Sequence, residues 1–169
     1  MRSKQLAFLP LAFVVALLDQ LAKLHAMNTI PVGTRTPLIA DVLSLAHVPG
    51  AGVVFGFLAG WAPGAQLFGF VLLAIVATTV VFFFHRGLAP GEFGSAAGLG
   101  AILGGIVSHA VDRLRFGTSL DFIHLGSVGS ETLPDFNLAD VAIVLGVVTL
   151  IVELLATEMA ARATERPRR

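Results

Sequence analysis

Four long apolar segments dominate the pattern of hydrophobic and polar positions along the chain. They cover about residues 6–24, 64–84, 93–111 and 138–156. A helix of about 20 residues rises about 30 Å, which is enough to cross the hydrocarbon of a bilayer. The second segment carries no charge between Leu67 and Ala77, so in a membrane its backbone can be satisfied only as a helix. The pattern therefore predicts four membrane-spanning helices.

The third segment differs from the others in its small residues. Gly94 and Gly98 are four positions apart, and so are Gly100 and Gly104. This spacing places small residues on one face of a helix and lets a neighbouring helix approach closely. We therefore expect the third helix to pack centrally in the bundle.

The connections between the helices differ in length. Two longer ones, about 25–63 and 112–137, would lie on one side of the membrane, with a short turn at 85–91 on the other. Prolines and alternating β-branched residues over about 28–46 suggest small strands separated by turns. We expect a single membrane-embedded domain over residues 1–169.

Composition excludes several kinds of chemistry. The chain is 56% hydrophobic and 13% charged, with a mean hydropathy of +0.86, which is typical of a membrane protein. It has no cysteine, so disulfides, thiolate nucleophiles and thiolate metal sites are excluded. Its formal net charge is zero, and we therefore expect no nucleic-acid partner. Any chemistry must use oxygen and nitrogen groups.

The basic residues predict an orientation. With both termini in the cytoplasm, the cytoplasmic side receives Arg2, Lys4, Arg86, Arg162, Arg166, Arg168 and Arg169. The other side keeps Lys23, Arg35, Arg113 and Arg115. This asymmetry follows the positive-inside rule, so the two longer connections would face outward.

The N-terminus permits a second interpretation. Residues 1–4 and the apolar run that ends near Ala26 resemble a secretory signal peptide with a small-residue cleavage site. However, Asp19 and Gln20 are unexpected inside a disposable apolar run, and three further spanning segments follow. We therefore expect the first helix to be retained.

Two aspartates lie at the edges of apolar segments. Asp121 follows the third segment, and Asp140 lies at the start of the fourth. An ionised carboxylate is costly there, so such residues are usually functional. Two carboxylates held close in a partly desolvated site share a proton, and one can act as an acid while the other acts as a base on a peptide bond. The sequence leaves open which aspartate starts protonated.

Four motifs occur in a fixed order along nearly the whole chain. They are Asp19-Gln20-x-x-Lys23, Gly52-Val-Val-Phe55-Gly56, Asp112-Arg113-x3-Gly117-x3-Asp121-Phe122 and Phe136-Asn137-x-Ala139-Asp140. On a four-helix pattern of this length, the chain resembles the lipoprotein signal peptidase family, also called signal peptidase II.

The resemblance implies a fold and an activity. The fold would be an all-α integral membrane protein, a four-helix bundle with a small extracytoplasmic β-cradle and a short interfacial helix. The activity would be that of an aspartic endopeptidase of the bacterial inner membrane. It would cut diacylglyceryl-modified prolipoproteins just before the lipidated cysteine, with Asp121 and Asp140 as the catalytic pair. The resemblance implies no cofactor and no metal, membrane lipid as a partner, and a monomer.

The resemblance also implies residues that support the site or bind substrate: Asp19, Lys23, Gly52, Phe55, Asp112, Arg113 and Asn137. His109 departs from the family's motif and is added to these residues because of its position. Asp19 and Lys23 lie on one helical face and would form an ion pair. Asp112 and Arg113 would form a structural pair or bind the active-site loop, although Arg113 could instead face the headgroups. Asn137 would cap the fourth helix or orient the nearby catalytic aspartate.

The chain departs from the family's motifs in two places. The family usually has asparagine where this chain has Gly50, and Gly-Asn where it has Ser108-His109. His109 lies three residues before Asp112, so both side chains could share a helical face near the catalytic pair. Either His109 replaces the missing amide as a hydrogen-bond donor and adds pH dependence, or it is only a polar residue at a helix end.

Three other functions are less consistent with the sequence. A non-catalytic binder of lipoprotein precursors could lose the catalytic pair, but Asp121 and Asp140 are both present. A small transporter would place charges near mid-membrane and often shows an inverted repeat, which is not evident here. A metal-dependent headgroup transferase would need several carboxylates, and the cytoplasmic turn supplies only Glu92. We therefore favour the peptidase.

Overall fold

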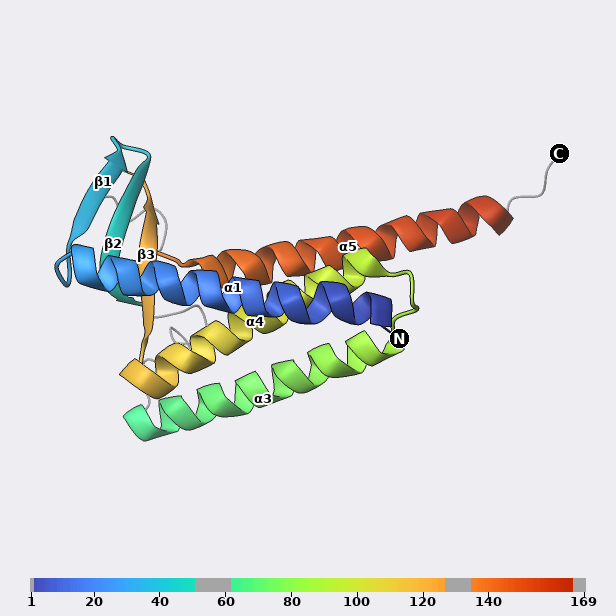
Figure 1. Ribbon diagram of the computed structural model, residues 1–169, viewed down its shortest axis with the longest axis horizontal. Helices are drawn as coiled ribbons and strands as arrows, with labels where there is room; N and C mark the ends of the chain where they lie inside the picture. Colours follow the sequence, from blue (N-terminus) through green and yellow to red (C-terminus); the bar gives the residue numbers. More distant parts are fainter. Residues whose placement is uncertain (1, 51–61, 127–134, 166–169) are drawn as a thin grey trace.

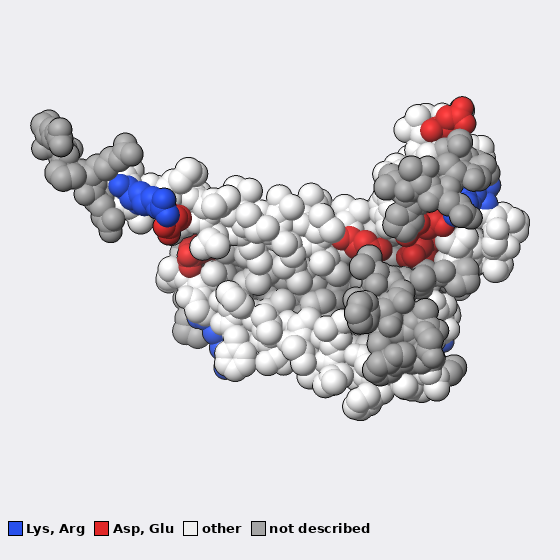
Figure 2. All heavy atoms as spheres, turned by 180° about the vertical axis from the view of Figure 1, so that it is seen from behind, with Lys and Arg blue, Asp and Glu red and all other residues white. Residues whose placement is uncertain are grey.

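The computed structural model describes residues 2–50, 62–126 and 135–165. Four helices account for most of these residues (Figure 1): α1 (Arg2–Thr29), α3 (Pro63–Gly87), α4 (Phe93–Phe116) and α5 (Leu138–Glu165). All four are long and apolar enough to cross a membrane, which confirms the prediction of four spanning helices. Their outer surfaces carry few charges, and charged side chains gather toward the two ends of the molecule (Figure 2).

Helix α4 lies at the centre of the bundle, as its small residues predicted. It packs against α1, α3 and α5, and half of its most apolar stretch is buried. A Cβ atom added to Gly104 would lie 2.6 Å from the carbonyl oxygen of Ala12 in α1. A Cβ atom on Gly146 of α5 would lie 2.6 Å from the carbonyl oxygen of Gly98. Glycine at these positions lets the helix backbones touch directly.

Helix α4 is longer than the sequence predicted. We expected it to end near residue 111, before Asp112 and Arg113, but it continues to Phe116. The predicted bound marked the end of the apolar run, and the connection was expected to begin at Asp112. In the structure the Asp112 carboxylate accepts hydrogen bonds from α1, so the helix can continue past it. It ends at Gly117, whose φ of 72° gives a left-handed cap with its N–H bonded to the Arg113 carbonyl.

A three-stranded antiparallel sheet lies at one end of the bundle (Figure 1). Its order is β1 (Arg35–Ile39), β2 (Leu43–Gly50) and β3 (Ser119–Leu125). The first two strands confirm the short strands expected after the first helix. The alternation of residues did not predict β3, which follows α4 directly after the Gly117 cap.

Backbone pairing brings the start of α5 against the sheet. The Phe136 carbonyl accepts hydrogen bonds from the N–H groups of Phe122 and Ile123, and its own N–H donates to the Ile123 carbonyl. A small apolar cluster of Ala26, Ile30, Leu120 and Phe122 packs β3 against the end of α1. Residues 19–23, 108–121 and 137–140 therefore converge at one end of the bundle.

Two predictions concern residues outside the described ranges or elements not found within them. Within residues 2–50, 62–126 and 135–165 no further short helix is present, so the predicted interfacial helix stays a prediction. Gly52 and Phe55, which we expected near the site, lie outside the described residues.

Candidate active site

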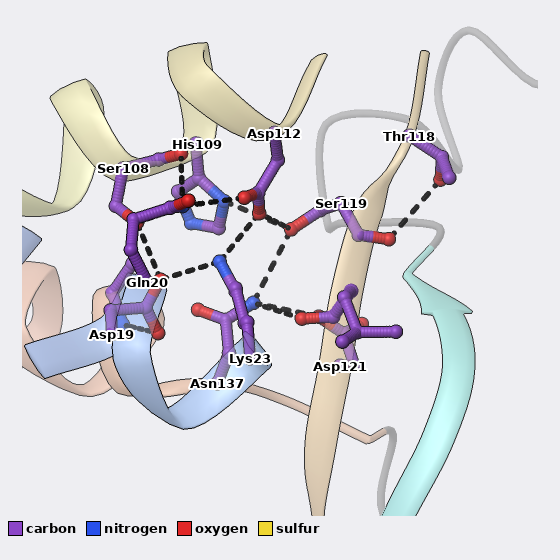
Figure 3. A network of polar contacts seen from close by, with 12 residues as sticks. Asp19, Gln20, Lys23, Ser108, His109, Asp112, Thr118, Ser119, Asp121 and Asn137 are labelled. Carbon is purple, nitrogen blue, oxygen red and sulfur yellow. Dashed lines mark hydrogen bonds and ion pairs between the residues drawn. The ribbon is translucent and has the colours of Figure 1, made fainter. Parts of the chain in front are cut away.

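Asp121 and Asp140 both bind one asparagine, Asn137, whose contact with Asp121 is seen in Figure 3. Asp121 is buried on β3, and its Oδ1 accepts a hydrogen bond of 2.7 Å from the side-chain amide of Asn137. Asp140 lies in the first turn of α5, and its Oδ2 accepts a 3.0 Å hydrogen bond from the backbone N–H of Asn137. The structure thus brings together the two aspartates that the sequence singled out.

The Asn137–Asp140 contact is reciprocal and explains how α5 begins. The side-chain oxygen of Asn137 accepts a 3.1 Å hydrogen bond from the N–H of Asp140. Together with the bond in the opposite direction, this forms a capping box in which asparagine and aspartate take the usual roles of serine and glutamate. The predicted helix cap is confirmed, and the same residue also orients Asp121 through its amide nitrogen.

The environment of Asp121 favours its protonated form. Burial raises the pKa of Asp121 to about 6, although the hydrogen bond from Asn137 acts in the opposite direction. The negative charge of Asp140 raises this pKa further, whereas His109 and Lys23 lower it. A carboxyl group of this kind can hold a proton near neutral pH and donate it during a reaction.

A buried polar cluster supports the aspartate pair from the side of α1. Lys23 Nζ lies 2.5 Å from carboxylate oxygens of both Asp19 and Asp112. The predicted ion pair of Asp19 and Lys23 is therefore present, but a third charged residue shares it. Asp19 also accepts a 3.1 Å hydrogen bond from the backbone N–H of Ala139, so α1 helps cap α5. All three charged side chains are almost completely buried, and they satisfy one another there.

Three further residues belong to this cluster, and none of them was among the predicted site residues. Gln20 donates hydrogen bonds of 2.6 Å to Asp112 Oδ1 and 2.9 Å to Ser108 Oγ. The Ser108 hydroxyl donates a 2.5 Å bond to Asp19, and the Ser119 hydroxyl donates a 3.0 Å bond to Asp112 Oδ2. Gln20 stood within a motif, but the roles of the two serines depend on contacts between distant elements.

His109 lies between the buried cluster and the aspartate pair. Its Nε2 is 3.1 Å from Asp140 Oδ1, and its Nδ1 is 3.2 Å from Ser119 Oγ. The expected position of His109 on the same helical side as Asp112 and near the aspartates is therefore observed. Its ring contacts Asp140 directly instead of capping a helix end.

The Arg113 side chain is buried, and it contacts helix α3. Its guanidinium lies 5.5 Å from the centre of the Phe70 ring of α3, which is a cation–π contact. Arg113 also lines an open groove between α3 and α4 together with Ile106 and Ala110. The predicted role of Arg113 in holding the active-site loop stays a prediction.

A second polar cluster ties the sheet to the segment before α5. Arg35 on β1 forms a 2.7 Å ion pair with Asp135, whose other oxygen lies 2.7 Å from Nδ1 of His124 on β3. These contacts hold the chain just before Asn137. Among the described residues, no group of three or more His, Asp or Glu side chains is arranged to hold a metal ion.

Solved structures show where this arrangement of helices and sheet is found. Two structures described as bacterial membrane enzymes superpose on the chain with TM-scores of 0.77 and 0.73. They are 22% and 23% identical in sequence, and they cover 94% and 86% of this chain and 92% and 90% of their own chains. The fold is therefore that of a known class of bacterial membrane enzymes.

Relatives in sequence identify the family. The lipoprotein signal peptidase of Burkholderia ambifaria is 37% identical, covering 88% of this chain and 87% of the relative. That of Bartonella tribocorum is 33% identical over 94% of this chain and 93% of its own, and that of Halothermothrix orenii is 32% identical over 86% and 92%. The family model described as signal peptidase (SPase) II matches residues 11–156. This protein therefore belongs to the signal peptidase II family of bacterial membrane peptidases.

Proposed function

We propose that this protein is an aspartic endopeptidase that removes the signal peptide from diacylglyceryl-modified prolipoproteins, cutting just before the lipidated cysteine. Asp121 and Asp140 would be its catalytic pair. The observation that carries this proposal is the geometry of Asn137, which binds Asp121 through its side-chain amide and Asp140 through its backbone N–H. Membership of the signal peptidase II family supports the substrate class.

The proposed reaction needs one proton on the pair. The ionised aspartate accepts a proton from a water molecule, and this water attacks the carbonyl carbon of the scissile bond. The protonated aspartate donates its proton to the developing oxyanion, which gives a tetrahedral diol. The aspartate that took the proton from water passes it to the amine as the C–N bond breaks, and the other aspartate takes back a proton from a diol hydroxyl. The pKa of about 6 for Asp121 supports a pair that holds a single proton near neutral pH.

The site would act at the outer face of the membrane. The sheet and the aspartate pair lie at the end of the bundle opposite the N-terminus and the short connection between α3 and α4 (Figure 1). The positive-inside rule favours a cytoplasmic position for both termini and for that connection, because Arg86 lies in the last turn of α3. A lipid-modified substrate would then reach the pair from the outer half of the bilayer, along the exposed apolar faces of the helices.

A transporter would distribute its charges differently. The buried charged residues Asp19, Lys23, Asp112 and Asp121 gather beside the sheet, at one end of the helices. An ion or substrate pathway would require such groups near mid-membrane. Their position at the membrane edge instead suits a peptide bond that lies next to a lipid anchor.

The test compares Asp121→Asn and Asp140→Asn with the parent enzyme in detergent, on a diacylglyceryl-modified prolipoprotein. Each variant removes the acid or base function, so cleavage should fall by at least about 1,000-fold. Asp41→Asn is the matched control, because Asp41 is an exposed aspartate in the turn between β1 and β2. Unchanged cleavage by both site variants would show that the mechanism is wrong. Equal cleavage of the unlipidated precursor would show that the substrate class is wrong.

A further inference from the structure

His109 has hydrogen-bond partners at both ring nitrogens, and the identity of those partners restricts where its protons lie. Nε2 is 3.1 Å from Asp140 Oδ1, and Nδ1 is 3.2 Å from Ser119 Oγ. The side chain of His109 is 16% exposed and that of Asp140 is 38% exposed. His109 and Asp140 are thus held in place by hydrogen bonds, and water can still reach both side chains.

The Ser119 hydroxyl decides the role of Nδ1. A hydroxyl has one hydrogen, and Ser119 donates it to Asp112 Oδ2 at 3.0 Å. The ionised carboxylate of Asp112 has no hydrogen to donate, so it accepts this bond as it accepts those from Lys23 and Gln20. Ser119 Oγ can therefore only accept from His109, so Nδ1 carries a hydrogen.

The contact between His109 Nε2 and Asp140 Oδ1 needs one more proton, because a hydrogen bond forms there only if one of the two atoms carries a hydrogen. An imidazole has an ordinary pKa of about 6.5 and an aspartate one of about 3.9, so the imidazole is the stronger base of the two. With this proton on Nε2, His109 would be an imidazolium ion that donates to Asp140 Oδ1 across the 3.1 Å contact. Asp140 Oδ2 accepts the backbone N–H of Asn137, so both of its oxygens face donors.

We propose that His109 is a positioning residue whose positive charge keeps Asp140 ionised, so that Asp140 is the general base and Asp121 carries the catalytic proton. This inference rests on the proposed function and assigns the two roles that the pair alone leaves open. It also makes His109 a third titrating group of the site, where the family usually has an uncharged asparagine.

The charges around His109 are consistent with this assignment. Asp140 faces it from α5, Asp121 from β3, and Asp112 from its own helix through Ser119. Lys23 of α1 lies 2.5 Å from carboxylate oxygens of both Asp19 and Asp112, and its charge also lowers the pKa of Asp121. Helix α3 carries His85 and Arg86 in its last turn, at the far end of the bundle (Figure 1). One carboxylate thus contacts the imidazole ring directly, a second is linked to it through Ser119, and a third is influenced by its charge.

The assignment predicts a specific change in the pH dependence of cleavage. A cation favours the ionised form of every carboxyl group near it. The charge of His109 therefore keeps both limbs of the bell-shaped plot of cleavage rate against pH at lower pH. His109→Asn keeps an amide donor but removes the charge. Both limbs should then move to higher pH, and the ratio of activity at pH 5 to activity at pH 7 should fall about fivefold.

The activity measurement uses the detergent-purified full-length enzyme and a diacylglyceryl-modified prolipoprotein. His25→Asn is the matched control, because His25 is an exposed histidine on α1 outside the site. A lower kcat with unmoved limbs would mean that His109 only fills space, and it would overturn the inference. Limbs that move to lower pH would overturn it as well.

A second measurement does not depend on activity. Nitrogen-15 NMR of the histidine rings, assigned with His109→Asn, should show both His109 nitrogens protonated at pH 7. In Asp140→Asn fewer rings should carry both protons at pH 7, since the ion pair is gone. The same fraction of doubly protonated rings in both proteins would overturn the inference while leaving the proposed function intact. Absence of cleavage by the parent enzyme would instead count against the function.

Discussion

Asn137 illustrates how one residue can join two chemical groups that are distant in the sequence. Its side-chain oxygen and backbone N–H form the capping box with Asp140, and its amide nitrogen donates to Asp121. The residue is completely buried, so each of these bonds is made away from bulk water. Correct placement of the catalytic pair therefore depends on the same bonds that start α5.

Two substitutions at Asn137 separate the cap from the catalytic contact. Serine can still accept from the N–H of Asp140, but like alanine it cannot reach Asp121. We expect cleavage to fall about 100-fold in both Asn137→Ser and Asn137→Ala. Only the alanine variant should lose a further 1 kcal/mol or so of stability, because it also loses the cap. Thermal unfolding and cleavage rates measure the two effects, and equal stability of the variants would contradict the capping role.

The raised pKa of Asp121 has a consequence for stability. Since its pKa is about 6 in the folded protein and 3.8 ordinarily, folding disfavours the ionised form. This group therefore destabilises the protein above pH 6, and the penalty disappears as the pH falls below 4. Asp121→Asn removes this penalty of about 3 kcal/mol, so the variant should unfold about 8 °C higher than the parent at pH 8. Unfolding temperatures from pH 4 to 8 test this, and a difference independent of pH would contradict it.

At the scale of the elements, the central position of α4 depends on its close approach to α1. The added Cβ at Gly104 would lie 2.6 Å from the Ala12 carbonyl oxygen and 2.7 Å from Val15 Cβ. One turn further along, Ser108 accepts a hydrogen bond from Gln20 of α1. Packing of the glycine face and the buried polar contacts are therefore parts of one interface.

A pair of glycine substitutions tests this interface. Gly104→Ala should lower the unfolding temperature by about 5 °C, because the α1 backbone cannot move aside without cost. Gly64→Ala is the matched control on α3, where an added Cβ meets no atom within 4 Å. It should be neutral or slightly stabilising. Equal effects of the two variants in detergent would show that the α1–α4 contact does not limit stability.

The elements also show what the sequence could and could not predict. Apolar runs longer than a bilayer is thick predict spanning helices directly, and the small residues of α4 predicted its central position. The predicted end of α4 was wrong because the charge of Asp112 is balanced by Lys23, which lies 89 residues away in the sequence. Strand β3 was missed for a related reason, since it is defined by pairing with β2 rather than by its own alternation. Local patterns contain no record of such distant partners.

At the scale of the whole molecule, family motifs identified the aspartate pair, and three-dimensional contacts supplied its environment. Asp121 and Asp140 could be selected because carboxylates are costly at the edge of apolar segments. Ser119 could not be selected, because its role arises only when β3 and α4 bring it between His109 and Asp112. Chemistry-bearing residues are thus visible in the sequence, while the residues that connect them become visible in the fold.

The proposed orientation can be tested in the protein as it stands, because the chain contains no cysteine. Single cysteines report which side of the membrane a position faces when a membrane-impermeant maleimide is added to spheroplasts. Thr36→Cys lies on the exposed side of β1, Gly91→Cys in the turn between α3 and α4, and Val148→Cys on an exposed apolar face of α5.

We expect Thr36→Cys to be labelled in intact spheroplasts and Gly91→Cys only after the membrane is permeabilised, because the positive-inside rule places the α3–α4 turn in the cytoplasm. Val148→Cys should resist labelling in both conditions, since a cysteine in lipid is not ionised and is out of reach of the reagent. The reverse labelling of the first two positions would place Asp121 and Asp140 in the cytoplasm. That outcome would contradict the outward site, because the sheet that carries Thr36 also carries Asp121.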